Sequence, residues 1–210
     1  MFGSRRWFWI TLAIIFLGVG SYYVERRNVP TRSADTVEEV TKAMAKRYVE
    51  VDREFAARME AHRSEMPPVP FGPEQAIVAT KRTAMRAWVA GATGIIDESL
   101  AKRERIGHEF IAQIEASKAG ENAKRAMLAG IRTAAVQVPL SVKLMNATRA
   151  YLEKTGEMVA YLDQNALAIA LREGQLEFDD PAAGERYNQF EHELAALEQE
   201  LQRLQKQAQR

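Results

Sequence analysis

The sequence predicts an all-α protein: a single N-terminal transmembrane helix, followed by an elongated antiparallel helical bundle or hairpin with a coiled-coil-like C-terminal helix. Three observations predict this fold. Residues 7–24 form an apolar stretch without a charged residue. From position 33 onward the strong helix formers Ala, Glu, Gln, Arg, Leu and Lys dominate. Gly and Pro are few and clustered, and no sustained period-2 alternation occurs, so we expect essentially no β-sheet.

The composition excludes several classes of function. Lys and Arg number 29 against 28 Asp and Glu, a balance that gives no support for a nucleic-acid partner, which would need a basic face. The chain has no cysteine, and this excludes disulfides, thiolate catalysis and cysteine zinc sites. The hydrophobic share of 47% is ordinary for a folded globular chain and argues against global disorder.

The apolar stretch after the short tail of residues 1–6 has the features of a membrane anchor. As a helix, residues 7–24 would reach roughly 27 Å, close to the hydrocarbon thickness of a bilayer. Aromatic side chains that suit the membrane interface stand at both ends, namely Trp7, Trp9, Tyr22 and Tyr23. A cleaved signal peptide is the alternative, but Gly18-Val19-Gly20 is a poor cleavage site, so we favour an uncleaved anchor.

The flanking charges indicate the orientation only weakly. Arg5 and Arg6 precede the stretch, and Arg26 and Arg27 follow it within the linker of residues 25–35. A short tail before an apolar segment is typical of a signal anchor that keeps its N-terminus in the cytoplasm. We therefore expect a single-pass protein of a bacterial-type inner membrane with an extracytoplasmic C-terminal domain.

The first helix after the linker is expected over residues 36–66. Thr36 and Glu39 have the spacing of a capping box. Apolar residues then recur at steps of three and four as one stripe, namely Val37, Val40, Met44, Tyr48, Val51, Phe55 and Met59. Four prolines within residues 67–73 cannot be helical, so this segment is interpreted as a stiff elbow; a short proline-recognition segment is the alternative.

Residues 74–175 are expected to form a long helical hairpin. Its first arm carries the core candidates Ile77, Ala84, Trp88, Ile95, Ile106, Phe110 and Ile114. The small residues at positions 90–94 indicate a close helix crossing near Trp88, or alternatively a hinge. Gly120 marks the turn, Pro139 should kink or interrupt the second arm, and Gly156 is a weaker break point. Core candidates of that arm include Leu144, Met158, Leu162 and Ile169.

Residues 176–210 are assigned to a loop, which already begins near Glu173, and to a C-terminal helix that starts at Asp180-Pro181. Six residues of this helix form a heptad seam: Tyr187, Phe190, Leu194, Leu197, Leu201 and Leu204. Because the seam is narrow and its flanks are rich in Glu and Gln, we favour self-association or partner docking. Packing within the chain is the alternative.

No arrangement of residues that would carry chemistry is found. His62, His108 and His192 fall on different expected helices, and Glu104 and His108 sit one helical turn apart, so that they could share a face. No phosphate loop, dinucleotide fingerprint or nucleophile motif occurs. We expect no enzyme, cofactor, metal site or small-molecule substrate. The expected partners are the lipid bilayer and either other proteins or a second copy through helical packing.

Two functions remain open from the sequence. A membrane-anchored helical scaffold or accessory subunit, which mediates protein–protein assembly at the membrane, is favoured by the anchor, the elbow and the C-terminal seam. An extracytoplasmic ligand-sensing helical bundle is the alternative.

Overall fold

A computed structural model describes residues 35–65, 72–117, 119–136 and 139–208. The fold is predominantly helical, which confirms the all-α prediction. The elements are, in chain order, α2 (Asp35–Ser64), α3 (Pro73–Ala76), α4 (Ala79–Ala116), α5 (Glu121–Val136), α6 (Leu140–Gln164), β1 (Ile169–Arg172), β2 (Gln175–Phe178) and α7 (Pro181–Ala208).

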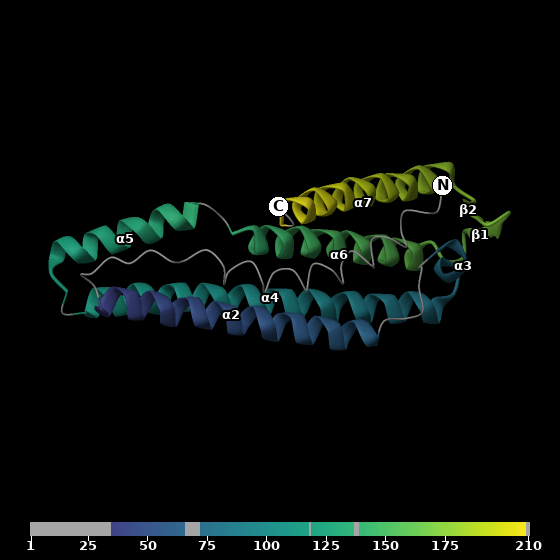
Figure 1. The fold of residues 1–210 in the computed structure, drawn as a ribbon. Helices are drawn as coiled ribbons and strands as arrows, with labels where there is room; N and C mark the ends of the chain where they lie inside the picture. Colours follow the sequence, from purple (N-terminus) through teal and green to yellow (C-terminus); the bar gives the residue numbers. More distant parts are fainter. Residues whose placement is uncertain (1–34, 66–71, 118, 137–138, 209–210) are drawn as a thin grey trace.

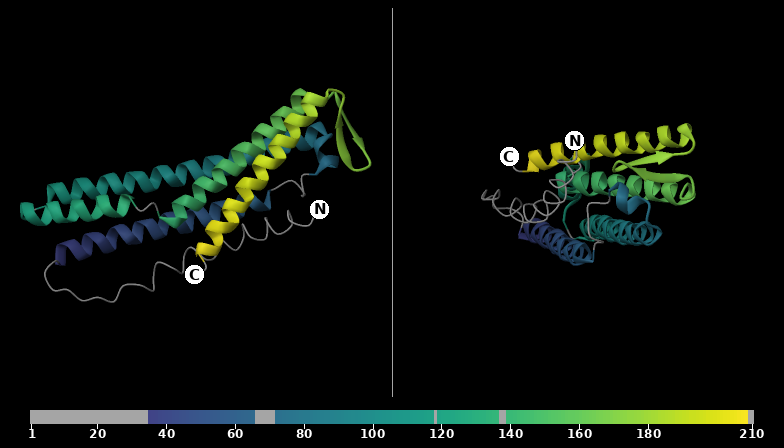
Figure 2. Two further views of the ribbon diagram at one scale, coloured as in Figure 1. Left: turned by 90° about the horizontal axis from the view of Figure 1, so that it is seen from above. Right: turned by 90° about the vertical axis from the view of Figure 1, so that its right-hand side faces the viewer.

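The long helices form an open stack rather than a closed bundle (Figures 1 and 2). α2 packs on α4, α4 on α6, and α6 on α7, whereas α2 and α7 at the two outer sides share at most marginal contact among the described residues. Neighbouring helices in this stack run antiparallel. α5 runs in the same direction as α6, which follows it in the chain, and lies beside the C-terminal end of α4.

Side-chain contacts fix the register of α2 on α4. The Lys102 Nζ and Glu54 Oε1 atoms are 2.5 Å apart, and Arg47 Nη1 lies 2.7 Å from Glu109 Oε2. Extending this antiparallel register places the start of α2 beside the turn between α4 and α5. The chain therefore enters the bundle at the α5 end, as Figure 1 also shows.

The main core lies where α4 is enclosed between α2 and α6. Ala92 and Ile96 on α4 and Val159 on α6 have no solvent exposure. α6 lies close to α4 at Gly156, because a Cβ built there would be in van der Waals contact with Val89 Cγ1 at 3.4 Å. Gly156 is therefore a contact point inside a continuous α6, and the prediction of a weak point in the helix there is wrong.

A second cluster joins α6, α7, the β-hairpin and α3. Ala76, Met158, Leu162, Phe190 and Leu194 are its buried members. Aromatic rings surround them: the Tyr161 and Phe190 centroids are 5.6 Å apart, and the Tyr161 hydroxyl donates to the Ala183 carbonyl at 2.9 Å. Together these contacts hold the start of α7 against the end of α6.

The β-hairpin of residues 169–178 corrects the expectation of essentially no β-sheet. α6 ends at Gln164 rather than near residue 175, and Ile169, expected on that helix, begins β1. β1 and β2 pair antiparallel around Glu173 and Gly174, whose φ angles of 50° and 78° are both positive, as a two-residue type I′ turn requires. Apolar side chains of the hairpin alternate toward the second cluster, so the segment has its own packed face.

Several predicted boundaries are confirmed. α5 ends at Val136 and α6 begins at Leu140 directly after Pro139, so this proline interrupts the arm as expected. Pro73 occupies the start of α3, and α7 begins after Asp180, whose Oδ1 accepts from the Ala182 amide at 2.9 Å. Residues 66–71 of the expected elbow lie outside the described residues.

The crossing near Trp88 is a reciprocal contact between α2 and α4. The Trp88 indole Nε1 donates to the His62 carbonyl at 3.0 Å, and His62 Nε2 donates to the Trp88 carbonyl at 2.7 Å. The two rings stack at 5.4 Å with 9° between their planes. Gly91 leaves the room for the imidazole, since a Cβ there would lie 2.5 Å from His62 Cε1. The predicted close crossing is confirmed.

We expect Gly91→Ala to lower the free energy of unfolding by about 1–3 kcal/mol, because the new methyl group would displace the His62 ring. Gly94→Ala is the matched control: nothing lies within 4 Å of a Cβ there, so the helix should gain about 0.5–1 kcal/mol. Urea unfolding of the full chain in mild detergent measures both. Equal effects of the two substitutions would contradict the assigned role of Gly91.

Candidate interaction surface

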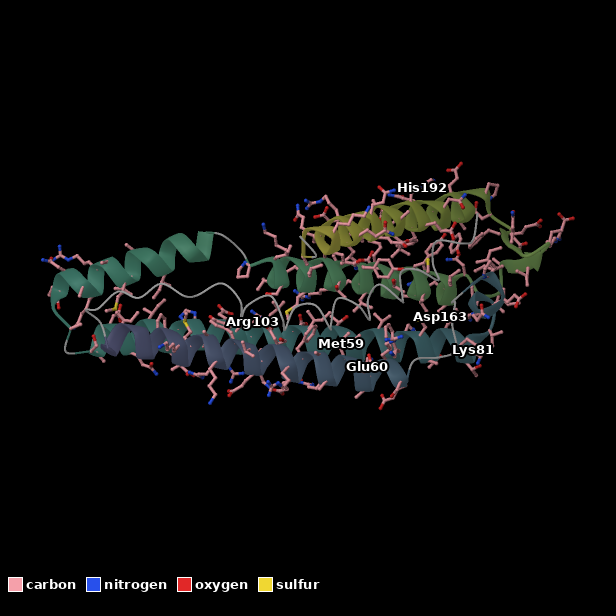
Figure 3. All side chains as sticks on the ribbon, viewed as in Figure 1. Met59, Glu60, Lys81, Arg103, Asp163 and His192 are labelled. Atoms are coloured by element: carbon pink, nitrogen blue, oxygen red, sulfur yellow. The ribbon has the colours of Figure 1, made fainter. Side chains whose placement is uncertain are left out.

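The buried charges of the interior tie helices together. Arg82 on α4 is almost fully buried; its Nε donates to Asp163 Oδ1 on α6 at 2.5 Å and its Nη1 to the Ala76 carbonyl at 2.7 Å. Arg86 Nη1 approaches the other Asp163 oxygen at 3.1 Å. Figure 3 shows Asp163 at the hairpin end of the bundle. This cluster aligns α3, α4 and α6 at that end.

A second buried tie joins α2 and α4 toward the other end. The Arg103 guanidinium hydrogen-bonds Asp52 and lies 5.6 Å from the centroid of the Tyr48 ring. The Tyr48 hydroxyl donates to the Arg103 carbonyl at 3.3 Å. Sequence reasoning missed both arginines as interior residues, because a long cationic side chain on a helix is usually solvated.

Metal-ligand groups, the Glu104–His108 pair and cavities can each be followed in the described residues. Among them, no group of three His, Asp or Glu side chains could hold a metal ion. Glu104 and His108 approach to 3.7 Å, but both side chains are 75% exposed. A hollow between α2 and α4, lined by Val51, Glu54 and Ser99 among others, encloses about 10 Å³, which is room for about one water molecule.

The predicted seam of α7 lies along α6 of the same chain. Phe190, Leu194, Leu201 and Leu204 are buried, and Tyr187 and Leu197 are half-buried. The seam therefore packs within the chain, which was the alternative interpretation of its heptad pattern. A partner would have to bind elsewhere on this conformation.

The predicted anchor residues Trp7, Trp9, Tyr22 and Tyr23 lie outside the described residues. Among the helices that the structure describes, none combines the length and apolar character that a membrane crossing needs.

Exposed apolar side chains gather at the hairpin end of the stack. Ile77 and Val78, between α3 and α4, are 40% and 41% exposed, and Leu167, between α6 and β1, is fully exposed. We call Ile77, Val78 and Leu167 the tip residues. Ile77 was expected in the core, and this expectation is wrong because the α3–α4 junction turns its side chain outward. Nothing in the sequence pattern distinguishes these residues from ordinary core positions.

α5 is the other incompletely covered element. Its main contact is with α4, where Lys124 Nζ donates to the Glu115 carbonyl at 3.0 Å. Met127, Leu128 and Ile131 share the α4-facing side but are only half-buried, and no α5 side chain that the structure describes is fully buried.

Comparison of the chain with protein-family models, with curated proteins and with solved structures finds no match.

Lys154 links α6 to α7 electrostatically. Its Nζ lies 2.6 Å from Glu157 Oε2 and 2.9 Å from Glu193 Oε2 of α7. The hydrogen bonds that Lys154 donates to Glu157 and Glu193 raise the pKa of Lys154, and the same bond to Glu193 lowers the pKa of that carboxyl below its ordinary value. A carboxylate with a lowered pKa favours the folded state at neutral pH.

We expect the stabilisation of the folded state by the Lys154–Glu193 pair to be present at neutral pH and to be lost as the pH falls through the lowered pKa of Glu193. The substitution Glu193→Gln removes this stabilisation at every pH. The difference in free energy of unfolding between the wild type and Glu193→Gln should therefore shrink on acidification, which urea titrations at pH 7 and at progressively lower pH would measure. A difference that grows on acidification would refute the linkage.

We expect Asp163→Ala to lower the free energy of unfolding by about 3 kcal/mol, because it leaves the Arg82 charge buried without its carboxylate. Asp97→Ala provides the control in the same α4–α6 interface. Asp97 pairs with Arg149 at 3.0 Å with both side chains more than 40% exposed, so its loss should cost less than about 1 kcal/mol. Urea unfolding of the two variants side by side tests the ranking, and the reverse order would disprove it.

Proposed function

We propose that the chain is a membrane-anchored helical scaffold or accessory subunit that mediates protein–protein assembly at the membrane. The observation that carries the proposal is the exposure of the tip residues at one end of the helical stack. Isolated exposed leucines are common on protein surfaces, but among the side chains that the structure describes the exposed large apolar residues lie at a single end. A partner protein would bury them.

The layout of the chain supports this function. The chain enters the bundle at the α5 end, and α4, with 38 residues, spans about 57 Å from there toward the tip. With residues 7–24 in a bacterial-type inner membrane and the bundle on the extracytoplasmic side, the tether and the partner-binding end would be well separated. The stack would act as a spacer between the bilayer and the partner.

The interior contacts also favour assembly over ligand sensing. A sensing bundle would need a polar pocket at the helix crossing near Trp88. That space is filled by the stacked rings of His62 and Trp88, each of which donates a hydrogen bond to the backbone carbonyl of the other residue. The buried arginines are likewise engaged in ties between helices.

Affinity purification of the intact protein in mild detergent, followed by mass spectrometry and measurement of the native mass, tests the proposal. We expect a stoichiometric partner protein that is lost with Leu167→Asp, because a carboxylate would be buried at the contact. Ala196→Asp, on the exposed side of α7, is the matched control and should retain the partner.

Recovery of the chain alone, or of the same partner at the same stoichiometry with Leu167→Asp, would contradict this assignment. Loss of the partner with both variants would indicate a general effect of the added charge rather than a contact at the tip.

A further inference from the structure

We propose that β1 takes an extended, basic segment of the partner protein as a third strand of the hairpin sheet. This proposal rests on the assembly function proposed above and deepens it, because it names the mode of docking at the tip and the chemistry of the segment that docks there. Three features of the tip support it: the open edge of β1, the exposed apolar residues beside that edge and the acidic charge around it.

One edge of the hairpin sheet is open. α7 packs beside β2, where a Cβ at Gly184 would lie 3.7 Å from Phe178 Cδ2. β1 lies on the side of the hairpin that faces away from α7 (Figure 1). Among the described residues, the sheet has two strands, so no further strand pairs with β1. Its outer backbone groups are therefore the ones that a strand from another protein could reach.

The register of the hairpin fixes which backbone groups point outward. The Asp179 amide donates to the Ala168 carbonyl at 2.9 Å, and the pairing continues from there to the turn without a bulge. Antiparallel residues alternate between pairs that bond each other and pairs whose N–H and C=O groups point away from the partner strand. On β1, this alternation turns the N–H and C=O groups of Ile169 and Leu171 outward.

β1 carries little of the protection that edge strands usually have. Natural edges are blunted by proline, by a bulge, by an inward-pointing charge or by short length. β1 contains no proline, its register is continuous, and the side chains of Ile169 and Leu171 are apolar and half-buried. Its charged residue, Arg172, is exposed at the turn, where its Nε lies 3.1 Å from Glu177 Oε2. The strand has four residues, which restricts docking to a short segment.

Apolar tip residues border this edge. Ile169 packs on the second cluster, which also contains Ala76 of α3. Ile77 and Val78 follow Ala76 directly, and Leu167 comes two residues before β1; all three are exposed. A third strand would lie about 4.8 Å from β1, and its alternate side chains would extend the apolar face of the hairpin. One docked segment can therefore combine backbone pairing with burial of apolar surface.

The charge around the edge selects a basic segment. Residues 169–180 carry a single cation, Arg172, and four carboxylates, all of them exposed. The carboxylates are those of Glu173, Glu177, Asp179 and Asp180. They attract Lys or Arg of a docking strand and repel a segment with acidic residues. A second copy of this chain would bring the same carboxylates to the contact, so the charge favours a different protein over edge-to-edge pairing of two hairpins.

Amide hydrogen exchange of the full chain in a non-ionic detergent tests the proposal. The probe is a synthetic peptide of about eight residues in which Val and Lys alternate, and the control peptide has Glu in place of Lys. At about 1 mM Lys peptide, we expect the amides of Ile169 and Leu171 to exchange about tenfold more slowly, because they become hydrogen-bond donors. Leu176 and Phe178, whose amides point outward on the α7 side, should keep their rates. The Glu peptide should protect neither pair.

A pair of proline substitutions provides the second arm. Leu171→Pro removes an outward N–H of β1 without removing a bond to β2, since proline is tolerated where the N–H of an edge strand faces solvent. Leu176→Pro makes the same change on β2 and is the matched control. The protection of Ile169 by the Lys peptide should be lost with Leu171→Pro and kept with Leu176→Pro. Exchange in the unsubstituted chain is independent of whether either variant folds.

Several results would overturn the proposal. Unchanged exchange of Ile169 and Leu171 with the Lys peptide would show that the edge of β1 takes no strand. Equal protection by both peptides would remove the preference for a basic segment, and equal slowing on β1 and β2 would indicate a general stabilisation of the hairpin. Protection that arises without peptide and increases with protein concentration would place a second copy at the edge.

The two proposals fail separately. If affinity purification recovers the chain alone, the assembly function and this inference are both removed. If a partner is recovered that depends on Leu167, the exchange of Ile169 and Leu171 is measured in that complex. Rates equal to those of the free chain would remove the third strand and leave the assembly function in place.

Discussion

The close packing of α4 against α6 is the constraint on which the other contacts depend. At Gly156 of α6 a Cβ would already touch Val89 of α4, and the small residue Ala92 lies in the same core with Ile96 and Val159, all three without solvent exposure. With this pair fixed, α4 presents one side to α2 and α6 presents one side to α7. A larger residue at either small position would separate the layers and loosen both outer helices, because cores tolerate added volume poorly.

Buried polar ties then set how each layer sits on the next. Apolar stripes alone allow a helix to slide by a turn, whereas Arg82 has one position that satisfies both Asp163 and the Ala76 carbonyl. The His62–Trp88 pair does the same for α2, since each ring bonds to the backbone of the other residue. Such ties cost desolvation, so their main contribution is to the choice of register rather than to net stability.

Much of the fold is predictable from the sequence, because periodic apolar residues and helix-stop signals act locally. The buried stripe of α2 at Val51, Phe55 and Met59, the interruption at Pro139 and the start of α7 follow from such signals. The hairpin was missed because its strands have four residues each; the Glu173-Gly174 pair between short alternating runs was the available signal. Burial of Arg82 and exposure of Leu167 depend on distant contacts, which a single sequence does not reveal.

The open layering of the helices has a consequence for partial unfolding. In a closed bundle each helix touches two neighbours, and the loss of one exposes the whole core. Here α7 is held by α6 and the hairpin, while the α2–α4 core lies on the other side of α6. α7 can therefore detach as a cooperative unit of its own while the remaining layers stay folded. In native-state hydrogen exchange, the amides on the two sides of α6 would then exchange through separate sub-global openings.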